Sequence, residues 1–194
     1  MTTSDNWAQE LAILKDAGVP LGPGLTATEL AAAEERCAAP FPPDLRALLS
    51  AALPLGDDFP DWRKLDDPAL GDRLSWPFEG ISFDIEYNGF WWPEWGKRPA
   101  DLEAALDIAR RALTSAPTLI PIDGHRFLPA EPCQAGNPVL SVYQTDVIYY
   151  GIDLRNYLAV EFARAERVSS PAREPRPVPF WSDLVAWNDR RAAH

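Results

Sequence analysis

The sequence lacks the features that mark membrane proteins, disulfide-rich proteins and zinc proteins. No apolar run approaches the roughly 20 residues that a helix needs to cross a bilayer, and the polar, acidic N-terminus does not resemble a secretory signal peptide. Two cysteines, Cys37 and Cys133, occur among 194 residues, and neither belongs to a CxxC pair. We therefore expect a cytoplasmic protein with free thiols and with no metal or other cofactor.

Histidine is scarce as well, because His125 is the only one besides the C-terminal His194. The sequence has no GxSxG motif and no glycine-rich phosphate loop. A general base would have to be His125, whose apolar neighbours favour a structural role instead. We predict a non-enzymatic protein without catalytic residues. The alternative is a small hydrolase or ligand-binding protein that uses His125 and Arg126 near a tryptophan-lined pocket.

Positive charge is in the minority, with 18 lysines and arginines against 29 aspartates and glutamates and a net charge of −11. Direct binding of nucleic acid is disfavoured, because contacts to phosphate groups need clustered Lys and Arg. An acidic surface suits a basic protein partner, through steering and charge complementarity. Acidity also keeps a protein soluble, so the charge alone does not identify a partner.

What the sequence does contain is a run typical of two consecutive β-hairpins, from Leu119 to Gly151. In the first hairpin, Asp123-Gly124 lies between two apolar runs and favours a two-residue turn. That register pairs Ile122 with His125 and places the histidine on the apolar face of the sheet. Arg126 then lies on the opposite face, where we expect it to form an ion pair.

The second hairpin joins two apolar runs through a tight connection at Gln144-Thr145. This register places Val142 opposite Val147 and Leu140 opposite Tyr149. Both faces of the hairpin are largely apolar, which predicts central strands that are covered on both sides.

The rest of the chain reads mainly as helices and loops that cover this sheet. Thr26 and Glu29 form a capping box at the start of one helix. Alternation of apolar and polar residues predicts one further strand at residues 81–86, whereas residues 19–24 are typical of a loop. The spacing of apolar residues predicts helices at 6–17, 26–39, 43–53, 100–114, 154–162 and 180–187.

Together these elements predict an α+β fold with a central, mostly antiparallel sheet, two hairpins in the C-terminal half and several flanking helices. We expect a single domain over residues 1–166. Residues 167–194 then form a proline-rich connector and a short C-terminal helix that packs back on the same domain.

The order of several short motifs resembles the SUKH superfamily of cell-wall assembly regulators and bacterial immunity proteins. These motifs are PPDLRALL (residues 42–49), Trp95-Gly96, LIPI (119–122), PVLSV (138–142) and YYG (149–151). The resemblance extends from about Leu21 to Phe162 and implies an α+β fold without a catalytic centre. It also implies a partner, since bacterial members bind and block toxin domains, while fungal members act as interaction scaffolds. A long loop at residues 54–77 and the extension after Phe162 depart from the family.

Two stretches are candidates for binding a protein partner. One is the aromatic segment with Trp91, Trp92 and Trp95, because tryptophan is enriched at binding hot spots. The same tryptophans suit stacking of a small ligand, binding of a proline-rich peptide or packing in the core. The other is an acidic loop, whose candidate contact residues are Asp57, Asp58, Asp61, Asp66 and Asp67.

The spacing of these carboxylates does not match a calcium-binding loop, so we expect solvated side chains that meet a basic protein surface rather than a metal. Our leading hypothesis is an immunity protein that binds and blocks a basic toxin domain. A regulatory scaffold without a toxin partner is the other non-enzymatic hypothesis.

Overall fold

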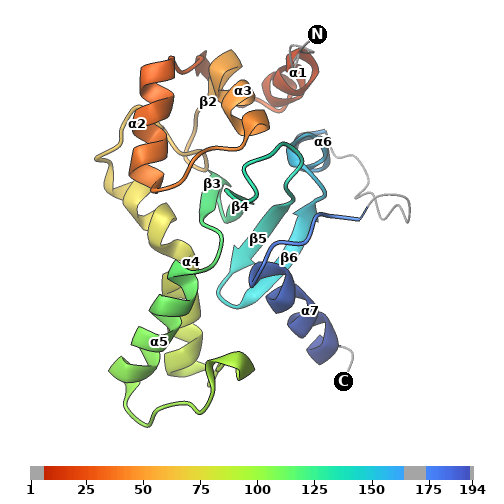
Figure 1. Ribbon diagram of the computed structural model, residues 1–194. Helices are drawn as coiled ribbons and strands as arrows, with labels where there is room; N and C mark the ends of the chain where they lie inside the picture. The colour runs from red at the N-terminus through yellow and green to blue at the C-terminus, as the bar shows by residue number, and fades with distance from the viewer. Residues whose placement is uncertain (1–6, 164–173, 193–194) are drawn as a thin grey trace.

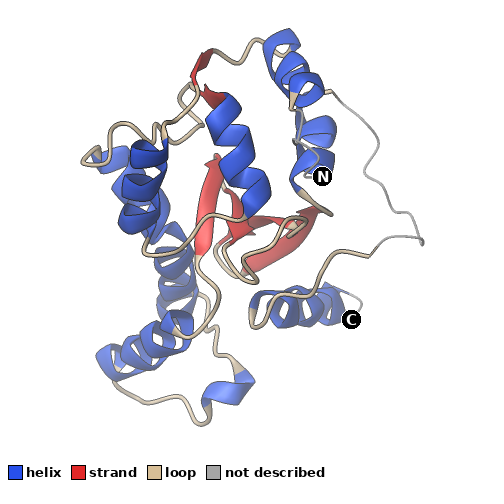
Figure 2. Ribbon diagram, turned by 45° about the horizontal axis from the view of Figure 1, so that its top comes forward, coloured by secondary structure: helices blue, strands red, loops and turns tan. Residues whose placement is uncertain are grey.

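The computed structural model of the chain describes residues 7–163 and 174–192. It confirms the α+β class, with helices surrounding a central antiparallel sheet (Figures 1 and 2). The elements, in chain order, are α1 Ala8–Asp16, β1 Leu21–Pro23, α2 Ala27–Cys37, α3 Pro43–Ala51, β2 Ala52–Pro54, α4 Pro68–Tyr87, the 3-10 helix η1 Pro93–Trp95, α5 Leu102–Thr114, β3 Leu119–Asp123, β4 Arg126–Pro129, β5 Val139–Tyr143, β6 Asp146–Gly151, α6 Leu154–Phe162 and α7 Trp181–Ala192.

The main sheet has four strands in the order β3-β4-β5-β6, each antiparallel to its neighbour. The predicted register of the second hairpin is confirmed, since Leu140 lies opposite Tyr149 and Val142 opposite Val147. A second, two-stranded sheet pairs β1 with β2. Its first strand falls in the segment predicted as a loop, because three residues that include glycine and proline carry no alternating signal.

Two hydrophobic cores lie on opposite faces of the main sheet. Adjacent strand residues alternate between them, so that Leu128 enters the first core and Phe127 the second. The first core is completed by α1, α2, α3 and α6, and the second by α5, α7 and the C-terminal half of α4. Both faces of the sheet are therefore covered, as the apolar strands predicted.

The start of α4 corrects two predictions about residues 54–86. The Asp67 carboxylate accepts a hydrogen bond from the Ala69 amide at 3.0 Å, and Pro68 occupies the first helical turn. The helix then continues for 20 residues and includes the stretch predicted as a strand. The irregular loop is shorter than expected as a result.

The six-residue alternation at 81–86 is compatible with a helix as well as with a strand. Ile81 and Ile85, four residues apart, are both fully buried, while Phe83 points to the opposite, exposed side of α4. The decisive signal lies in the longer spacing of Leu70, Pro77, Ile81 and Ile85, which follows the helical period.

The first hairpin turns one residue later than predicted. Asp123 pairs with Arg126, with a register shift between Pro121 and Asp123, so the turn residues are Gly124 and His125. Asp123 is consequently buried, and its carboxylate accepts a hydrogen bond from the Tyr157 hydroxyl at 2.8 Å. A buried carboxylate that has a specific partner explains why the aspartate belongs to the strand rather than to the turn.

Helix α7 packs along the outer strand β6 of the sheet (Figure 1). The Trp181 indole donates to the Pro117 carbonyl at 2.8 Å, and the Tyr149 hydroxyl donates to the Ser182 hydroxyl. The Asn188 side-chain amide donates to the carbonyl of Thr145 at 2.7 Å and contacts that of Val147. The helix extends to Ala192, beyond the predicted end at residue 187. The predicted boundary between residues 166 and 167 lies outside the described residues.

Candidate protein-binding face

The large hydrophobic side chains that stand exposed in the described ranges gather in one region, on α4 and the neighbouring β5–β6 turn. They are Trp76 at 39%, Phe83 at 45%, Tyr87 at 65% and Tyr143 at 55% exposure. Trp76 contacts Tyr143 with ring centroids 6.2 Å apart, and Phe83 contacts Tyr87 at 4.8 Å. Exposed aromatic residues that cluster in this way are typical of a protein-binding surface.

Helix α4 holds the β5–β6 turn through Trp76, Gly80 and Asp84, which lie on three successive helical turns. The Trp76 indole donates to the Val142 carbonyl at 2.8 Å. Gly80 lies so close to the turn that a Cβ at this position would stand 2.8 Å from the Gln144 Cα. Asp84 is buried and accepts hydrogen bonds from the Thr145 amide, at 2.9 Å, and from its hydroxyl. The turn and the helix thus form one continuous surface.

The outer face of α4 alternates acidic with aromatic residues. We use this name for Asp72, Trp76, Glu79, Phe83, Glu86 and Tyr87, which are all exposed. Arg73 is the only basic residue of the helix, and its guanidinium is already bound to the carbonyls of Gly124 and Asp57. Glu86, a hydrogen-bonding neighbour of Tyr87, raises the pKa of that hydroxyl above its usual value. The outer face is therefore both apolar and negatively charged.

A pocket adjoins the outer face at the C-terminal end of α4. It has a volume of about 540 Å³ and lies between α4, the β5–β6 turn and α7. Its lining residues include the aromatic residues Phe90, Trp91, Tyr143 and Trp187. We call it the turn pocket.

The tryptophans of the predicted aromatic segment lie partly in the second core. Trp92 is buried and contacts Phe180 and Trp187, and Trp95 stacks on Phe180. Trp91 is half-buried, and its indole donates to the Gly96 carbonyl at 2.7 Å. Among the three candidates, Trp91 is the one that lines the turn pocket.

The acidic loop is divided between exposed carboxylates and carboxylates with structural partners. Asp57, Asp58 and Asp66 are exposed. Asp67 caps α4, as described above, and Asp61 accepts from the Arg63 amide at 3.1 Å and pairs with Lys64. Asp61 and Asp67 therefore stabilise local structure.

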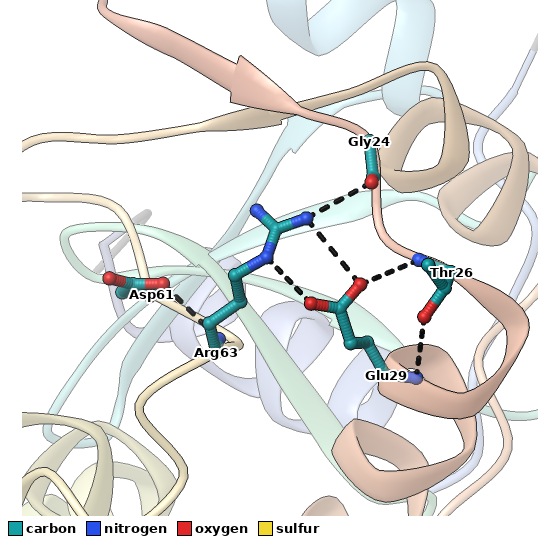
Figure 3. Close-up of polar contacts among 5 residues, drawn as sticks. All are labelled: Gly24, Thr26, Glu29, Asp61 and Arg63. Carbon is teal, nitrogen blue, oxygen red and sulfur yellow. Dashed lines mark hydrogen bonds and ion pairs between the residues drawn. The ribbon is translucent and has the colours of Figure 1, made fainter.

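Arg63 ties this loop to the capping box of α2 (Figure 3). Its guanidinium binds the Glu29 carboxylate at 2.7 Å and the Gly24 carbonyl at 3.0 Å. The same carboxylate accepts from the Thr26 amide, while the Thr26 hydroxyl accepts from the Glu29 amide, which confirms the predicted box. Hydrogen bonds from the Thr26 backbone and from Arg63 lower the pKa of Glu29 to about 2.

His125 lies at the tip of the first hairpin and not on the apolar face, so its predicted position is wrong. The ring is half-buried and meets Tyr143 edge-on at 6.2 Å. Burial, and then the charge of Arg126, lower the pKa of His125. Arg126 stacks on the Tyr150 ring at 3.8 Å and donates to Ser141, and it has no ion pair among the residues that the structure describes, where we expected one.

A cavity of about 190 Å³ surrounds this histidine. Its lining residues are Asp58, Asp123, Gly124, His125, Arg126 and Glu161, among which there is neither a tryptophan nor a hydroxyl or thiol nucleophile. His125 and the tryptophan segment thus border two separate cavities. Within the described ranges, no three His, Cys, Asp or Glu side chains are grouped so as to hold a metal ion.

The two predicted contact regions do not form a single surface. The acidic loop precedes α4 and the tryptophan segment follows it, and a helix of 20 residues is about 30 Å long. The outer face of α4 lies between them and was missed, because the strand predicted at 81–86 hid the helical period. Reading Trp76, Phe83 and Tyr87 at seven- and four-residue intervals would have found it.

Comparison of the chain with protein-family models, curated proteins and solved structures finds no match. None of the described helices is both long and apolar enough to cross a membrane. Cys37 and Cys133 are free thiols. Burial raises the pKa of Cys37 to about 12, as suits a cysteine that packs as a small apolar residue.

Proposed function

We propose that this chain is a non-enzymatic protein-interaction module that binds a basic partner through the outer face of α4. The observation that carries the proposal is the gathering of the exposed large aromatic side chains on a face that also bears three carboxylates. Aromatic side chains supply contact area at the centre of an interface, and the surrounding charge selects and steers the partner.

The partner that fits best is the basic domain of a toxin, which the module blocks by covering its surface. The net charge of −11 supports a basic partner, because opposite charge accelerates association. The resemblance of the motif order to the SUKH superfamily supports an immunity role. In this proposal the exposed Asp57, Asp58 and Asp66 extend the acidic surface beyond the N-terminal end of α4.

The test compares two charge-reversed variants of the tagged full-length chain in pull-downs from the native cytosol. Glu79→Lys with Glu86→Lys reverses charge on the outer face of α4. Glu35→Lys with Glu103→Lys makes the same net change at exposed positions of α2 and α5. We expect the first variant to lose a basic protein, encoded near this gene, at least about tenfold, a difference of about 1.4 kcal/mol. The second variant should retain it.

The purified partner then has to bind the wild-type chain in a defined ratio, with an affinity that falls as salt concentration rises. Phe83→Ala should weaken this binding at low and high salt alike, because it removes apolar contact area and no charge. Capture of the same proteins by both charge-reversed variants, or a partner whose binding ignores Phe83, would contradict the proposal.

A further inference from the structure

The residues that line the turn pocket include several aromatic residues and an exposed acidic residue. Trp91 and Tyr143 are among its aromatic lining residues, and Asp146 is its exposed acidic lining residue. The Asp146 backbone pairs with Tyr143 in the β5–β6 hairpin, but within the described ranges its carboxylate has no hydrogen-bond or ion-pair partner. The buried Asp84, which also lines the pocket, already accepts hydrogen bonds from Thr145 and from the Asn88 side-chain amide. Asp146 is thus the carboxylate left open to a ligand.

This combination is the one that recognises an organic cation. A cation gains energy over the face of Trp or Tyr, and a carboxylate adds charge-assisted hydrogen bonds. A guanidinium group exploits both at once, because it is planar, stacks on aromatic rings and can bind a carboxylate with two parallel N–H groups. An ammonium group is a compact, strongly hydrated charge and fits a stacking wall less well.

We infer that the turn pocket is a socket for an arginine side chain of the basic partner, an inference that rests on the proposed function. The pocket opens beside Tyr143, which also contacts Trp76 of the outer face of α4. A partner lying on the outer face therefore reaches the pocket with a side chain. Its volume of about 540 Å³ accommodates a side chain of that length with its bound water.

The inference is tested with N-acetyl-arginine amide as the probe, titrated into the isotope-labelled full-length chain and followed by two-dimensional NMR. We expect saturable shifts of the Gly89, Thr145 and Asp146 amides. N-acetyl-citrulline amide, which has the same shape without the charge, should bind at least about tenfold more weakly, since hydrogen bonds to charged groups are the stronger kind. N-acetyl-lysine amide should fall between the two.

Asp146→Asn should weaken binding of the arginine probe by about three- to tenfold. Asp16→Asn is the matched control, because it removes the same charge at an exposed position of α1, outside the outer face and the turn pocket, and should change affinity by less than about twofold. Tyr143→Leu, which leaves the charge unchanged, should weaken binding by about two- to fivefold. The unperturbed amide spectrum of each variant verifies its fold.

Equal binding of the citrulline and arginine probes, or equal effects of Asp146→Asn and Asp16→Asn, would contradict the inference that the turn pocket binds an arginine side chain. The proposed function would survive that result if a basic partner still depended on Glu79, Phe83 and Glu86. The converse result is specific binding of the arginine probe when no partner depends on the outer face. That result would support the arginine site and contradict the proposed function.

Discussion

At the scale of single residues, Gly80 determines how closely α4 approaches the β5–β6 turn. Any other residue would direct a Cβ at the Gln144 backbone, with its Cα at 2.8 Å and its amide nitrogen at 3.0 Å. Gly71, nine residues earlier in the same helix, has only the Arg36 guanidinium within contact range, at 3.6 Å. The two glycines therefore form a matched pair, one required by packing and one not.

Gly80→Ala should lower the free energy of unfolding by about 1–3 kcal/mol, because the added methyl group meets backbone that cannot move aside easily. Gly71→Ala should raise it by about 0.5–1 kcal/mol, since alanine is the better helix former. Urea unfolding followed by circular dichroism measures both. Equal effects of the two substitutions would show that the close approach of α4 to the turn is not present in solution.

Glu29 provides a residue-scale prediction about pH. Its pKa of about 2 in the folded chain lies below the ordinary value of 4.5, so the ionised carboxylate stabilises the folded state at every pH above about 4.5. This stabilisation is lost as the pH falls from about 4.5 towards 2. Glu29→Gln should therefore lower the melting temperature at pH 7, and its difference from wild type should shrink over that acidic range.

A melting difference for Glu29→Gln that stayed constant between pH 7 and pH 2.5 would contradict the role assigned to the charge. High salt should reduce the difference at pH 7, because the pair with Arg63 is accessible to solvent. Thr26→Ala is the companion variant. It removes the side-chain cap and should cost about 1 kcal/mol.

At the scale of elements, the next prediction concerns the hydrogen bonds that Asp84 of α4 accepts from the β5–β6 turn. Asp84→Ala leaves the Thr145 amide and the Asn88 side chain without their acceptor and should cost about 1–3 kcal/mol. Hydrogen exchange at the Thr145 amide should accelerate more than at Val139, on the far end of β5. Glu79→Ala, on the exposed side of the same helix, should change stability by less than about 0.5 kcal/mol.

Elements whose signals agreed at several levels were predicted well from the sequence. The second hairpin combines apolar runs with a tight connection, and its register is as expected. The helix from Leu154 to Phe162 follows its Asp153 cap as predicted. Where local signals conflict, tertiary contacts decide: residues 81–86 alternate like a strand, but burial of Ile81 and Ile85 in the second core selects the helix.

The candidate site was less accessible to prediction, for a physical reason. Exposure of Phe83 and Tyr87 depends on which side of α4 faces the core, and that side is known only once the helix itself is recognised. Tyr143, at the end of β5, adjoins this face through its contact with Trp76, 67 residues away in sequence. Contacts of this kind leave no trace in spacing or composition.

At the scale of the whole molecule, the two cores share the four-stranded sheet. Alternate side chains of each strand enter the two cores. Unfolding of one core would therefore expose one face of the same sheet whose other face forms the second core. Helix α4 contributes to both, through Leu70 in the first core and Ile81 in the second. We therefore expect the chain to unfold as one cooperative unit.

Leu45→Ala in the first core and Leu184→Ala in the second should each cost about 2–5 kcal/mol, since both side chains are almost fully buried. Each variant should keep a single transition, with the same midpoint by tryptophan fluorescence and by circular dichroism. Asp189→Ala, at an exposed position of α7, is the control and should leave the midpoint nearly unchanged. Separate midpoints for the two probes would show that the cores unfold independently.

The contact of Asn188 with β6 bears on whether copies of the chain self-associate. An outer strand offers its unpaired carbonyl and amide groups as a template for strand exchange or fibril growth. The Asn188 amide contacts the carbonyl of Thr145, in the turn before β6, and that of Val147 within the strand, and α7 lies along β6. A second copy could extend the sheet from this edge only after displacing α7. The helix therefore hinders edge-to-edge association of two copies of the chain.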